Sequence, residues 1–554
     1  MSNFLSDTKK WQKIRENPEY EPLRSFISKE YDECCKDRDI PILKFSTEME
    51  YFKNGQRAGF EKPYFLRRRQ MTVYAILSLI YPENEEYFIN LCDVVAAICD
   101  EYSWQVPAHR PIDNRNKNDG HSLFAAETGL YLAEIKSIFA ERFDSCLTAR
   151  IEDALEKKLL SSFESRITGV EKKEIKNNWA PVCAGSIGLA FMYEAPERFE
   201  KIRPRIERCM ENYLSGISED GGTPEGADYW RYGFGFYTMY YETLKRAYSE
   251  ACAAGLYKDK AKKLAGFYSA ILLDENNAVA FSDASADAEC SVWLGYFLNR
   301  EYGTPLPPKH RLSINTEQFS TTIRAFLYYE PLLENGSLPL CEKYFDKLGW
   351  YIKRGKNYSF AVKGGKNDIE DNHNHNDIGS FIVTHGGKQL ICELGAPKYS
   401  AFTFGKTRYE VINNSSLGHS VPIVNGEGQL AGTDIFGELS VAEKVKVDMK
   451  NAYGTKIKKL ERSFELTENE LILTDEFDFG LDITERLVTD FEPKLTETLV
   501  MIDEAKIAVP KGWRVSVSER DTTYHSGKAH KIYLIDFVPE EKPDIFTIKI
   551  AFDV

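Results

Sequence analysis

The stretch DNHNHNDIGSFIVTHGGKQLICE, residues 371–393, decides how the rest of the chain is interpreted. Its second half is typical of a β-hairpin, because two runs rich in β-branched and apolar residues flank Gly386-Gly387, a two-residue turn signal. That turn sets a register in which three pairs face each other: His385 with Lys388, Thr384 with Gln389, and Ser380 with Glu393.

The first half of the stretch is rich in histidine. The chain has nine histidines in 554 residues, and four of them lie close together in sequence: His373, His375, His385 and His419. Side chains two positions apart on an extended backbone, such as His373 and His375, point to the same face. Two imidazoles and a carboxylate suit Zn²⁺, so His375, Glu393 and His419 are a candidate three-ligand set. The alternative is that these histidines are hydrogen-bonded residues at the rim of a sheet. His385, beside the turn, is left out of the set.

Residues 1 to about 330 show apolar residues at three- and four-residue spacing, which predicts helix after helix. Short loops with Pro, Gly, Asn and Asp separate these segments, so neighbouring helices should be antiparallel. The number of such pairs suggests an α/α toroid, although the sequence shows no strict repeat. The clearest helical segments are 66–82, 86–104, 123–140, 150–163, 204–217 and 235–248.

From about residue 343 the apolar period changes to two, which is typical of half-buried strands. Regular short strands with turn signals between them predict an antiparallel β-sandwich. The expected strands include 456–466, 470–477, 513–518, 531–537 and 545–552. The chain is therefore expected to be an α+β multidomain protein, with an incomplete α/α toroid at 1–335 and a β-sandwich at 342–554. A junction of this kind is a natural place for a cleft.

Composition narrows the function. The net charge of −14 argues against nucleic acid or an anionic membrane as a partner. No apolar run of about 18 residues predicts a membrane span, and no secretory signal is visible at the N-terminus, so a cytoplasmic location is expected. Eleven cysteines without a CxxC pair fit reduced thiols in such a compartment.

The histidine stretch and the residues that follow it resemble the heparinase II/III-like family of polysaccharide lyases. The similar positions, in order, are HNHNDIGSF at 373–381, Glu393-Leu394-Gly395, Tyr399, Arg408-Tyr409, Ser416, Gly418-His419 and Asn425-Gly426. The resemblance implies the same order of toroid and sandwich. It also implies cleavage of uronic-acid-containing glycans by β-elimination, on an acidic oligo- or polysaccharide that we expect to be imported.

Two helical segments resemble the toroid motifs of the family: NNWAPVC at 177–183 and DGGTPEGADYWRY at 220–232. The first motif usually supplies an asparagine followed by histidine, and here Trp179 follows Asn178. The resemblance implies that Asn178 neutralises the uronate carboxylate as charge flows into it. The substrate-binding residues that it implies are Trp179, Glu225, Arg231 and Arg408.

The resemblance also implies a base for the C5 proton and an acid for the leaving oxygen. The candidates are His373 and a tyrosine: Tyr229, Tyr232 or Tyr399. A tyrosine base would need a pKa lowered by a cation such as Arg408. His375, Glu393 and His419 would hold Zn²⁺ or another divalent metal in a structural role, although relatives typically have Asp where Glu393 stands.

Two other functions fit the sequence. A glycoside hydrolase on an α/α toroid needs two carboxylates, which Asp220, Glu225 and Asp228 could supply. A carbohydrate-binding protein without catalysis is the other. An elimination product absorbs in the ultraviolet, which separates the lyase from both. The oligomeric state is left open, with a homodimer as one of the alternatives.

Overall fold

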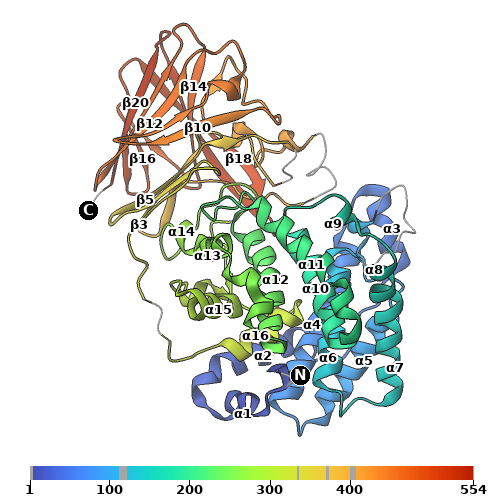
Figure 1. The fold of residues 1–554 in the computed structure, drawn as a ribbon. Coiled ribbons are helices and arrows are strands. Elements are labelled where there is room, and N and C mark those ends of the chain that lie inside the picture. The colour runs from blue at the N-terminus through green and yellow to red at the C-terminus, as the bar shows by residue number, and fades with distance from the viewer. Residues whose placement is uncertain (1–3, 111–120, 334–335, 370–372, 400–406, 553–554) are drawn as a thin grey trace. The chain divides into compact units, whose positions relative to one another are not determined.

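The structure is a computed structural model, and it describes residues 4–110, 121–333, 336–369, 373–399 and 407–552 (Figure 1). Asp371 and Asn372 of the histidine stretch lie outside the described residues. The chain forms two compact units. The helical unit comprises Met1–Gly216, Arg231–Lys262 and Cys290–Gly336, and the sandwich unit comprises Ile217–Trp230, Lys263–Glu289 and Ser337–Val554. The sandwich unit thus includes two segments from the part of the sequence that was expected to be helical. The domain boundary expected between residues 335 and 342 stays a prediction.

The helical unit is built from antiparallel helix pairs, which confirms the expected α/α toroid fold (Figure 1). Its central helices α6 and α10 pack against each other, and both are apolar and buried on nearly all sides. The helices of this unit are α1 (Thr8–Glu16), α2 (Glu21–Cys34), α3 (Phe45–Asn54), α4 (Ala58–Ile80), α5 (Glu85–Cys99), α6 (Leu123–Ile138), α7 (Ser145–Leu155), α8 (Ser161–Ser165), α9 (Gly169–Lys172), α10 (Trp179–Glu194), α11 (Pro196–Gly216), α15 (Val292–Tyr302) and α16 (Phe319–Tyr328).

Three further helices complete the list: α12 (Gly226–Ala247), α13 (Asp259–Ala265) and α14 (Phe267–Ile271). The helix expected at 235–248 is α12, which begins nine residues earlier, so Tyr229 and Tyr232 are both helical. The helix expected at 150–163 is present, and it contains a π-helical turn at Glu156–Leu160 between α7 and α8.

The sandwich unit contains a five-stranded, a nine-stranded and a four-stranded sheet, and every strand pair that the structure describes there is antiparallel. The five-stranded sheet has the order β3 (Cys341–Phe345), β4 (Trp350–Arg354), β5 (Tyr358–Lys363), β7 (Phe381–His385), β8 (Lys388–Ile391). The nine-stranded sheet has the order β15 (Lys494–Leu495), β16 (Leu499–Ile502), β17 (Ala505–Ala508), β20 (Ile545–Phe552), β13 (Glu470–Phe477), β12 (Leu460–Leu466), β11 (Val445–Asp448), β10 (Phe436–Val441), β6 (Gly365–Lys366). The four-stranded sheet has the order β18 (Trp513–Thr523), β19 (Ala529–Pro539), β14 (Ile483–Thr489), β9 (Ile423–Val424).

The five- and nine-stranded sheets share a core of alternating apolar side chains, as expected for a sandwich. The ring of Phe464 on β12 lies 4.8 Å from that of Phe360 on β5 and 5.2 Å from that of Phe381 on β7. Strand β13 alternates strictly between buried and half-buried residues, which explains why its bounds could be predicted.

The hairpin of β7 and β8 confirms the predicted turn at Gly386-Gly387 and the pairs next to it, His385 with Lys388 and Thr384 with Gln389. Beyond Thr384 a β-bulge shifts the register, because Val383 pairs with Ile391. Ser380 is therefore not directly opposite Glu393 along the backbone, yet its hydroxyl donates a hydrogen bond to the Glu393 carboxylate.

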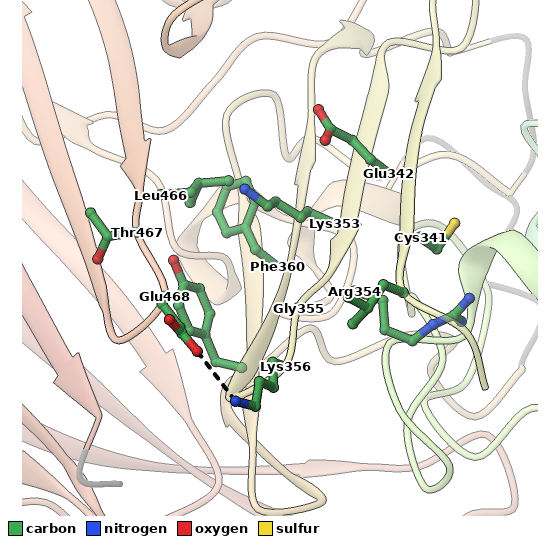
Figure 2. A pocket seen from close by; sticks show the side chains of 12 residues that line it. Cys341, Glu342, Lys353, Arg354, Gly355, Lys356, Phe360, Leu466, Thr467 and Glu468 are labelled. Carbon is green, nitrogen blue, oxygen red and sulfur yellow. Dashed lines mark ion pairs between the residues drawn. The ribbon is translucent and has the colours of Figure 1, made fainter. Parts of the chain in front are cut away.

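A cavity of about 510 Å³ opens where the β4–β5 and β12–β13 turns lie close together (Figure 2). An ion pair of 3.6 Å between Lys356 and Glu468 joins these two turns. The cavity shares no lining residue with the histidine stretch. Across the described ranges, no helix is both long and apolar enough to span a membrane.

Candidate active site

The candidate active site lies in the sandwich unit and is organised by Asp283, in the segment 281–289 between α14 and the short strand β1 (Cys290–Ser291). Two glycines let this segment approach its neighbours. A Cβ on Gly226 would lie 2.8 Å from the Cβ of Ala284, and one on Gly395 would lie 2.0 Å from the Ala284 carbonyl. Both glycines have positive φ. The Asp283 amide donates to the His373 carbonyl at 3.0 Å, which ties the segment to the histidine stretch.

The carboxylate of Asp283 holds several functional groups at once. Its Oδ2 lies 3.0 Å from His373 Nδ1 and accepts from the Tyr399 hydroxyl at 2.9 Å, while Oδ1 lies 2.9 Å from His375 Nε2. The guanidinium of Arg408 is 3.6 Å from Oδ2. Burial opposes the charge of Asp283, but the hydrogen bonds from His373 and His375 and the positive charge of Arg408 lower its pKa overall. Asp283 is therefore an ionised acceptor.

Tyr229 completes the network at the start of α12. Its hydroxyl lies 2.8 Å from that of Tyr399, and its ring centroid lies 4.0 Å from that of His373. Tyr229, Tyr399 and His373 are half-buried, whereas Asp283 is buried. The partial exposure of the three leaves them accessible to a ligand.

The lowered tyrosine pKa expected from Arg408 is not found. Burial raises the pKa of both Tyr229 and Tyr399, and the negative charge of Asp283 raises both further. Arg408 instead donates through Nη2 to the Asn374 carbonyl at 2.9 Å and faces Asp283. The two phenols are therefore protonated near neutral pH and suit proton donation.

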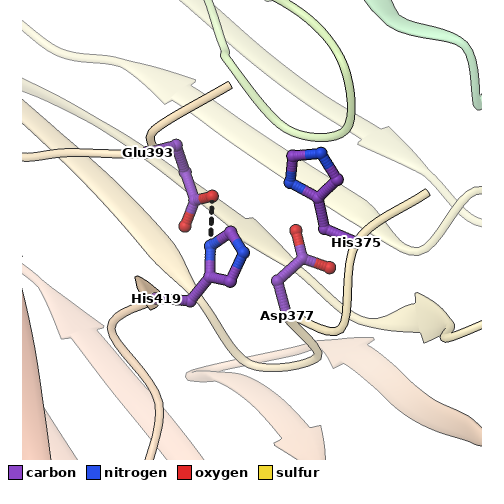
Figure 3. Close-up of side chains that lie close together, drawn as sticks. All are labelled: His375, Asp377, Glu393 and His419. Atoms are coloured by element: carbon purple, nitrogen blue, oxygen red, sulfur yellow. Dashed lines mark ion pairs between the residues drawn. The ribbon is translucent and has the colours of Figure 1, made fainter. Parts of the chain in front are cut away.

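Four buried side chains form a candidate metal site: His375, Asp377, Glu393 and His419 (Figure 3). One ligand atom from each lies within 4.8 Å of the others. His419 Nδ1 is 2.7 Å from Glu393 Oε2, but His375 Nδ1, Asp377 Oδ2 and His419 Nε2 have no hydrogen-bond partner. Buried polar atoms without partners are costly, and two imidazoles with two carboxylates suit a divalent ion such as Zn²⁺. These residues therefore fit a metal.

The surroundings orient this set. Asp283 holds His375 Nε2, so that Nδ1 is left for the cluster, an arrangement common around metal-binding histidines. Lys363 pairs with Asp377 and donates to Asn374 Oδ1 at 2.9 Å. Burial lowers the pKa of His375. Burial also acts to lower the pKa of His419, but Glu393 raises it overall.

Asn178, Trp179 and Tyr232 belong to the helical unit. Asn178 is buried at the N-terminus of α10, and the ring of Trp179 lies 4.9 Å from that of His109. The hydroxyl of Tyr232 donates to the Glu127 carboxylate. Burial raises the pKa of Glu127 to about 7, although its hydrogen bonds act in the opposite direction.

Three other residues singled out from the sequence lie close to Tyr229 and Tyr232 in the chain. Glu225 is buried in the sandwich unit, directly before Gly226. Arg231, in the helical unit, lies 3.5 Å from the Ser313 hydroxyl. Asp220, weighed as a hydrolase carboxylate, accepts a hydrogen bond from the Gly222 amide at 3.0 Å within its own turn.

Two residues of the site, Asp283 and Asp377, are not among those predicted from the sequence. Asp377 continues the alternation of His373 and His375, so its spacing was a usable signal. Asp283 follows the apolar run Val279-Ala280-Phe281 in a segment with no motif, and the side chains that hydrogen-bond to its carboxylate lie 90 to 116 positions later in the chain. No local pattern could have connected them.

One protein family resembles part of the chain. Residues 338–519 match the family model described as heparinase II/III-like, C-terminal. No curated protein matches the chain.

Solved structures resemble nearly the whole chain. A heparinase III gene product has a TM-score of 0.60 at 13% identity, over 99% of this chain and 93% of that one. Heparan sulfate lyase HepC from Pedobacter heparinus has 0.53 at 11% identity, over 98% and 92%. Chondroitin AC lyase from Streptomyces coelicolor A3, solved with chondroitin sulphate, has 0.59 at 8% identity, over 99% and 82%. At these identities the similarity concerns the fold.

Proposed function

Because residues 338–519 match the heparinase II/III-like, C-terminal family model, we propose that the chain is a lyase that cleaves uronic-acid-containing glycans by β-elimination. The observation that carries the proposal is the network of His373, Tyr399 and Tyr229 around the ionised Asp283. It combines a proton acceptor with two protonated phenols. The resembling structures are named as lyases of heparan and chondroitin type, which supports an acidic glycan as substrate.

His373 is the proposed base. With the Nδ1 proton donated to Asp283, Nε2 carries the lone pair and can take the C5 proton of the uronate. Asp283 then stabilises the imidazolium that forms. The resemblance assigns neutralisation of the uronate carboxylate to Asn178 of the helical unit, and this role stays a prediction.

Tyr399 or Tyr229 is the proposed acid. As the C4–O4 bond breaks and the C4=C5 double bond forms, the leaving O4 oxygen receives a proton from a phenol. The raised tyrosine pKa values keep that proton in place before the reaction. The hydrogen bond between the two hydroxyls lets Tyr229 return a proton to Tyr399.

A divalent ion, Zn²⁺ or another, is proposed at His375, Asp377, Glu393 and His419. When bound, it would supply a structural cross-link between the histidine stretch and the segments that follow β8 and precede β9. His373 is two residues from His375, so this cross-link would fix the position of the base. We also propose that the enzyme is cytoplasmic and acts on imported oligosaccharides. The free cysteine thiols support this location, because such thiols are typical of a reducing compartment.

The first test is His373→Ala, assayed by ultraviolet absorbance with heparan, chondroitin and polyuronate oligosaccharides. We expect at least about a 10²-fold loss of kcat/KM, the usual range for general base catalysis, in a protein that is still folded at the assay temperature although the loss of a partner of Asp283 lowers its Tm. His385→Ala is the matched control, because His385 bonds the Asn357 carbonyl outside the network. Retained turnover in His373→Ala would contradict the assignment.

Metal content is the second test. We expect about one divalent ion per chain by elemental analysis, and a lower Tm after chelation, because a ligand bound only to the folded state stabilises it. Asp377→Asn combined with Glu393→Gln should remove the ion. His530→Ala changes a buried histidine that pairs with Asp490 and should retain the ion. An ion-free protein whose Tm does not respond to added zinc would rule the site out.

A further inference from the structure

Two cysteines stand next to each other at the C-terminal end of α2, and Cys34-Cys35 is the one adjacent pair of cysteines in the sequence. Both are free thiols, and their sulfurs lie 3.4 Å apart, which is within hydrogen-bond distance for sulfur. Cys34 is half-buried, whereas Cys35 is buried. One thiol is therefore open to a reagent from solvent, and the other lies within reach of whatever the first one binds.

The backbone of this pair is fixed by contacts with α4. Gln70 Nε2 donates a hydrogen bond to the Cys34 carbonyl at 2.8 Å, and the Tyr74 hydroxyl donates to the Cys35 carbonyl at 3.0 Å. Both donors belong to buried side chains. The Cys35 amide also closes the last turn of α2 on the Tyr31 carbonyl at 2.9 Å. These contacts hold the two sulfurs as a pair before any ligand binds, so little further ordering is needed on binding.

The two thiols differ in acidity. The hydrogen bond that Cys35 donates lowers the pKa of Cys34. The positive charge of Arg69 acts in the same direction, whereas burial and two nearby carboxylates, those of Glu30 and Glu33, oppose it. The same hydrogen bond, together with burial, raises the pKa of Cys35. Because the thiolate rather than the thiol is the nucleophile, Cys34 is the group that attacks first.

Neither a zinc ion nor a disulfide suits this pair. Structural zinc takes four ligands, and within the described ranges no group of three or more metal-ligating side chains includes these two cysteines. A disulfide would be strained, because two Cα atoms joined by a trans peptide are about 3.8 Å apart, whereas disulfides usually span about 4.4–6.8 Å. The pair instead suits a single atom that bonds to both sulfurs and needs no further ligand from the protein.

We propose that Cys34 and Cys35 form a covalent binding site for trivalent arsenic, presented as an arsenoxide, R–As=O. The Cys34 sulfur attacks arsenic and forms the first As–S bond, and the Cys35 sulfur forms the second. Both As–O bonds break, and the oxygen leaves with the two thiol protons as water, so arsenic stays trivalent and nothing is oxidised or reduced. The second bond closes a ring within one molecule, which favours it over the capture of a second, separate thiol. The pair lies in the helical unit and shares no residue with the network around Asp283, so the inference does not depend on the proposed function.

The test is titration of the folded full chain with phenylarsine oxide, followed by intact-protein mass spectrometry and a count of free thiols. We expect one phenylarsine oxide per chain, with a mass gain equal to the reagent less one water, and the loss of two titratable thiols. Excess dimercaptopropanol should remove the arsenic, whereas the same concentration of mercaptoethanol should not, because a monothiol replaces one bond at a time. A chain that binds no arsenic, or that loses one thiol for each arsenic, would overturn the proposal.

Variants locate the arsenic. Cys34→Ser, at a half-exposed position, and Cys35→Ser should each weaken binding of phenylarsine oxide at least about 10²-fold, because a single thiol loses the gain from a second, linked bond. Cys146→Ser, which removes an exposed thiol of the same unit, is the matched control and should bind as the parent does. Thermal unfolding checks that each variant is folded. Undiminished binding by Cys34→Ser would place the arsenic elsewhere and refute the proposal.

Comparison with the unfolded chain separates a site built by the fold from the chemistry of any adjacent pair of cysteines. We expect the folded chain to bind phenylarsine oxide about 10-fold tighter than the same chain in concentrated guanidinium chloride, since two side chains are already ordered. Tyr74→Phe should reduce this advantage, because it removes the hydrogen bond to the Cys35 carbonyl. Tyr248→Phe, at an exposed position of the same unit, should leave the advantage unchanged. Equal or tighter binding by the unfolded chain would contradict a site built by the fold.

Discussion

A single buried carboxylate, that of Asp283, accepts hydrogen bonds from His373, His375 and Tyr399 and faces Arg408. A charge that is fully out of water is tolerated only when it is paired and hydrogen-bonded, and removing its partners or its charge has large effects. Asp283 thus determines which ring nitrogen of His373 carries the proton and how the Tyr399 hydroxyl is oriented.

Asp283→Asn should keep the fold but lower kcat/KM by about 10²- to 10³-fold, because an amide cannot accept all three hydrogen bonds and does not stabilise the imidazolium. Asp287→Asn, at an exposed position of the same segment, is the control. The measurement is steady-state kinetics together with thermal unfolding. Activity within about threefold of the parent would show that Asp283 is not needed to orient His373.

At the scale of elements, the site depends on how closely the segment 281–289 approaches the segment that follows β8. Gly395 has φ of +59° and lies where a Cβ would overlap the Ala284 carbonyl. Gly480 has φ of +92° but nothing within 4 Å of a Cβ. An alanine at Gly480 would therefore add backbone strain alone, whereas an alanine at Gly395 would add both backbone strain and steric overlap.

Gly395→Ala should lower both Tm and activity. Gly480→Ala should lower Tm only slightly and leave activity intact, because its cost is the strain of a left-handed residue, roughly 1–2 kcal/mol of the free energy of unfolding. Thermal unfolding and the ultraviolet assay measure both effects. Equal behaviour of the two variants would mean that the segment can shift without consequence for the site.

Elements with local signals could be predicted from the sequence. Strands β13 and β20 were expected with the bounds that they have, and the Gly386-Gly387 turn was expected with its adjacent pairs. The bulge between Val383 and Thr384 was not, because the two-residue turn fixes only the pairs next to it.

At the scale of the whole molecule, the order of toroid and sandwich could be predicted because the apolar period changes once along the chain. The interleaving of the two units could not. Residues 217–230 and 263–289 look helical or irregular in sequence, yet they belong to the sandwich unit and carry Tyr229 and Asp283. The candidate site is therefore half predictable. The histidines lie in a motif that the sequence shows, whereas Asp283, the carboxylate that orients them, lies in a segment without one.

The net charge of −14 has a kinetic consequence for an acidic substrate. Repulsion at long range should slow encounter at low ionic strength, where the Debye length is about 30 Å at 0.01 M and about 8 Å at 0.15 M. We expect kcat/KM to rise with added salt over this range, more for long oligosaccharides than for short ones. A steady fall with salt for all lengths would instead indicate a strongly basic binding surface.

The passage of the chain back and forth between the units also constrains its evolution. A recombination event near residue 337 would inherit His373, His375 and Tyr399 from one parent, but Tyr229 and Asp283 from the other. Such a hybrid could retain every residue of the segment that matches the family model and still lack Tyr229 and Asp283, which orient its side chains. Mutations in these two stretches should therefore be selected together, and gene fragments that end at this border should not carry an independently working site.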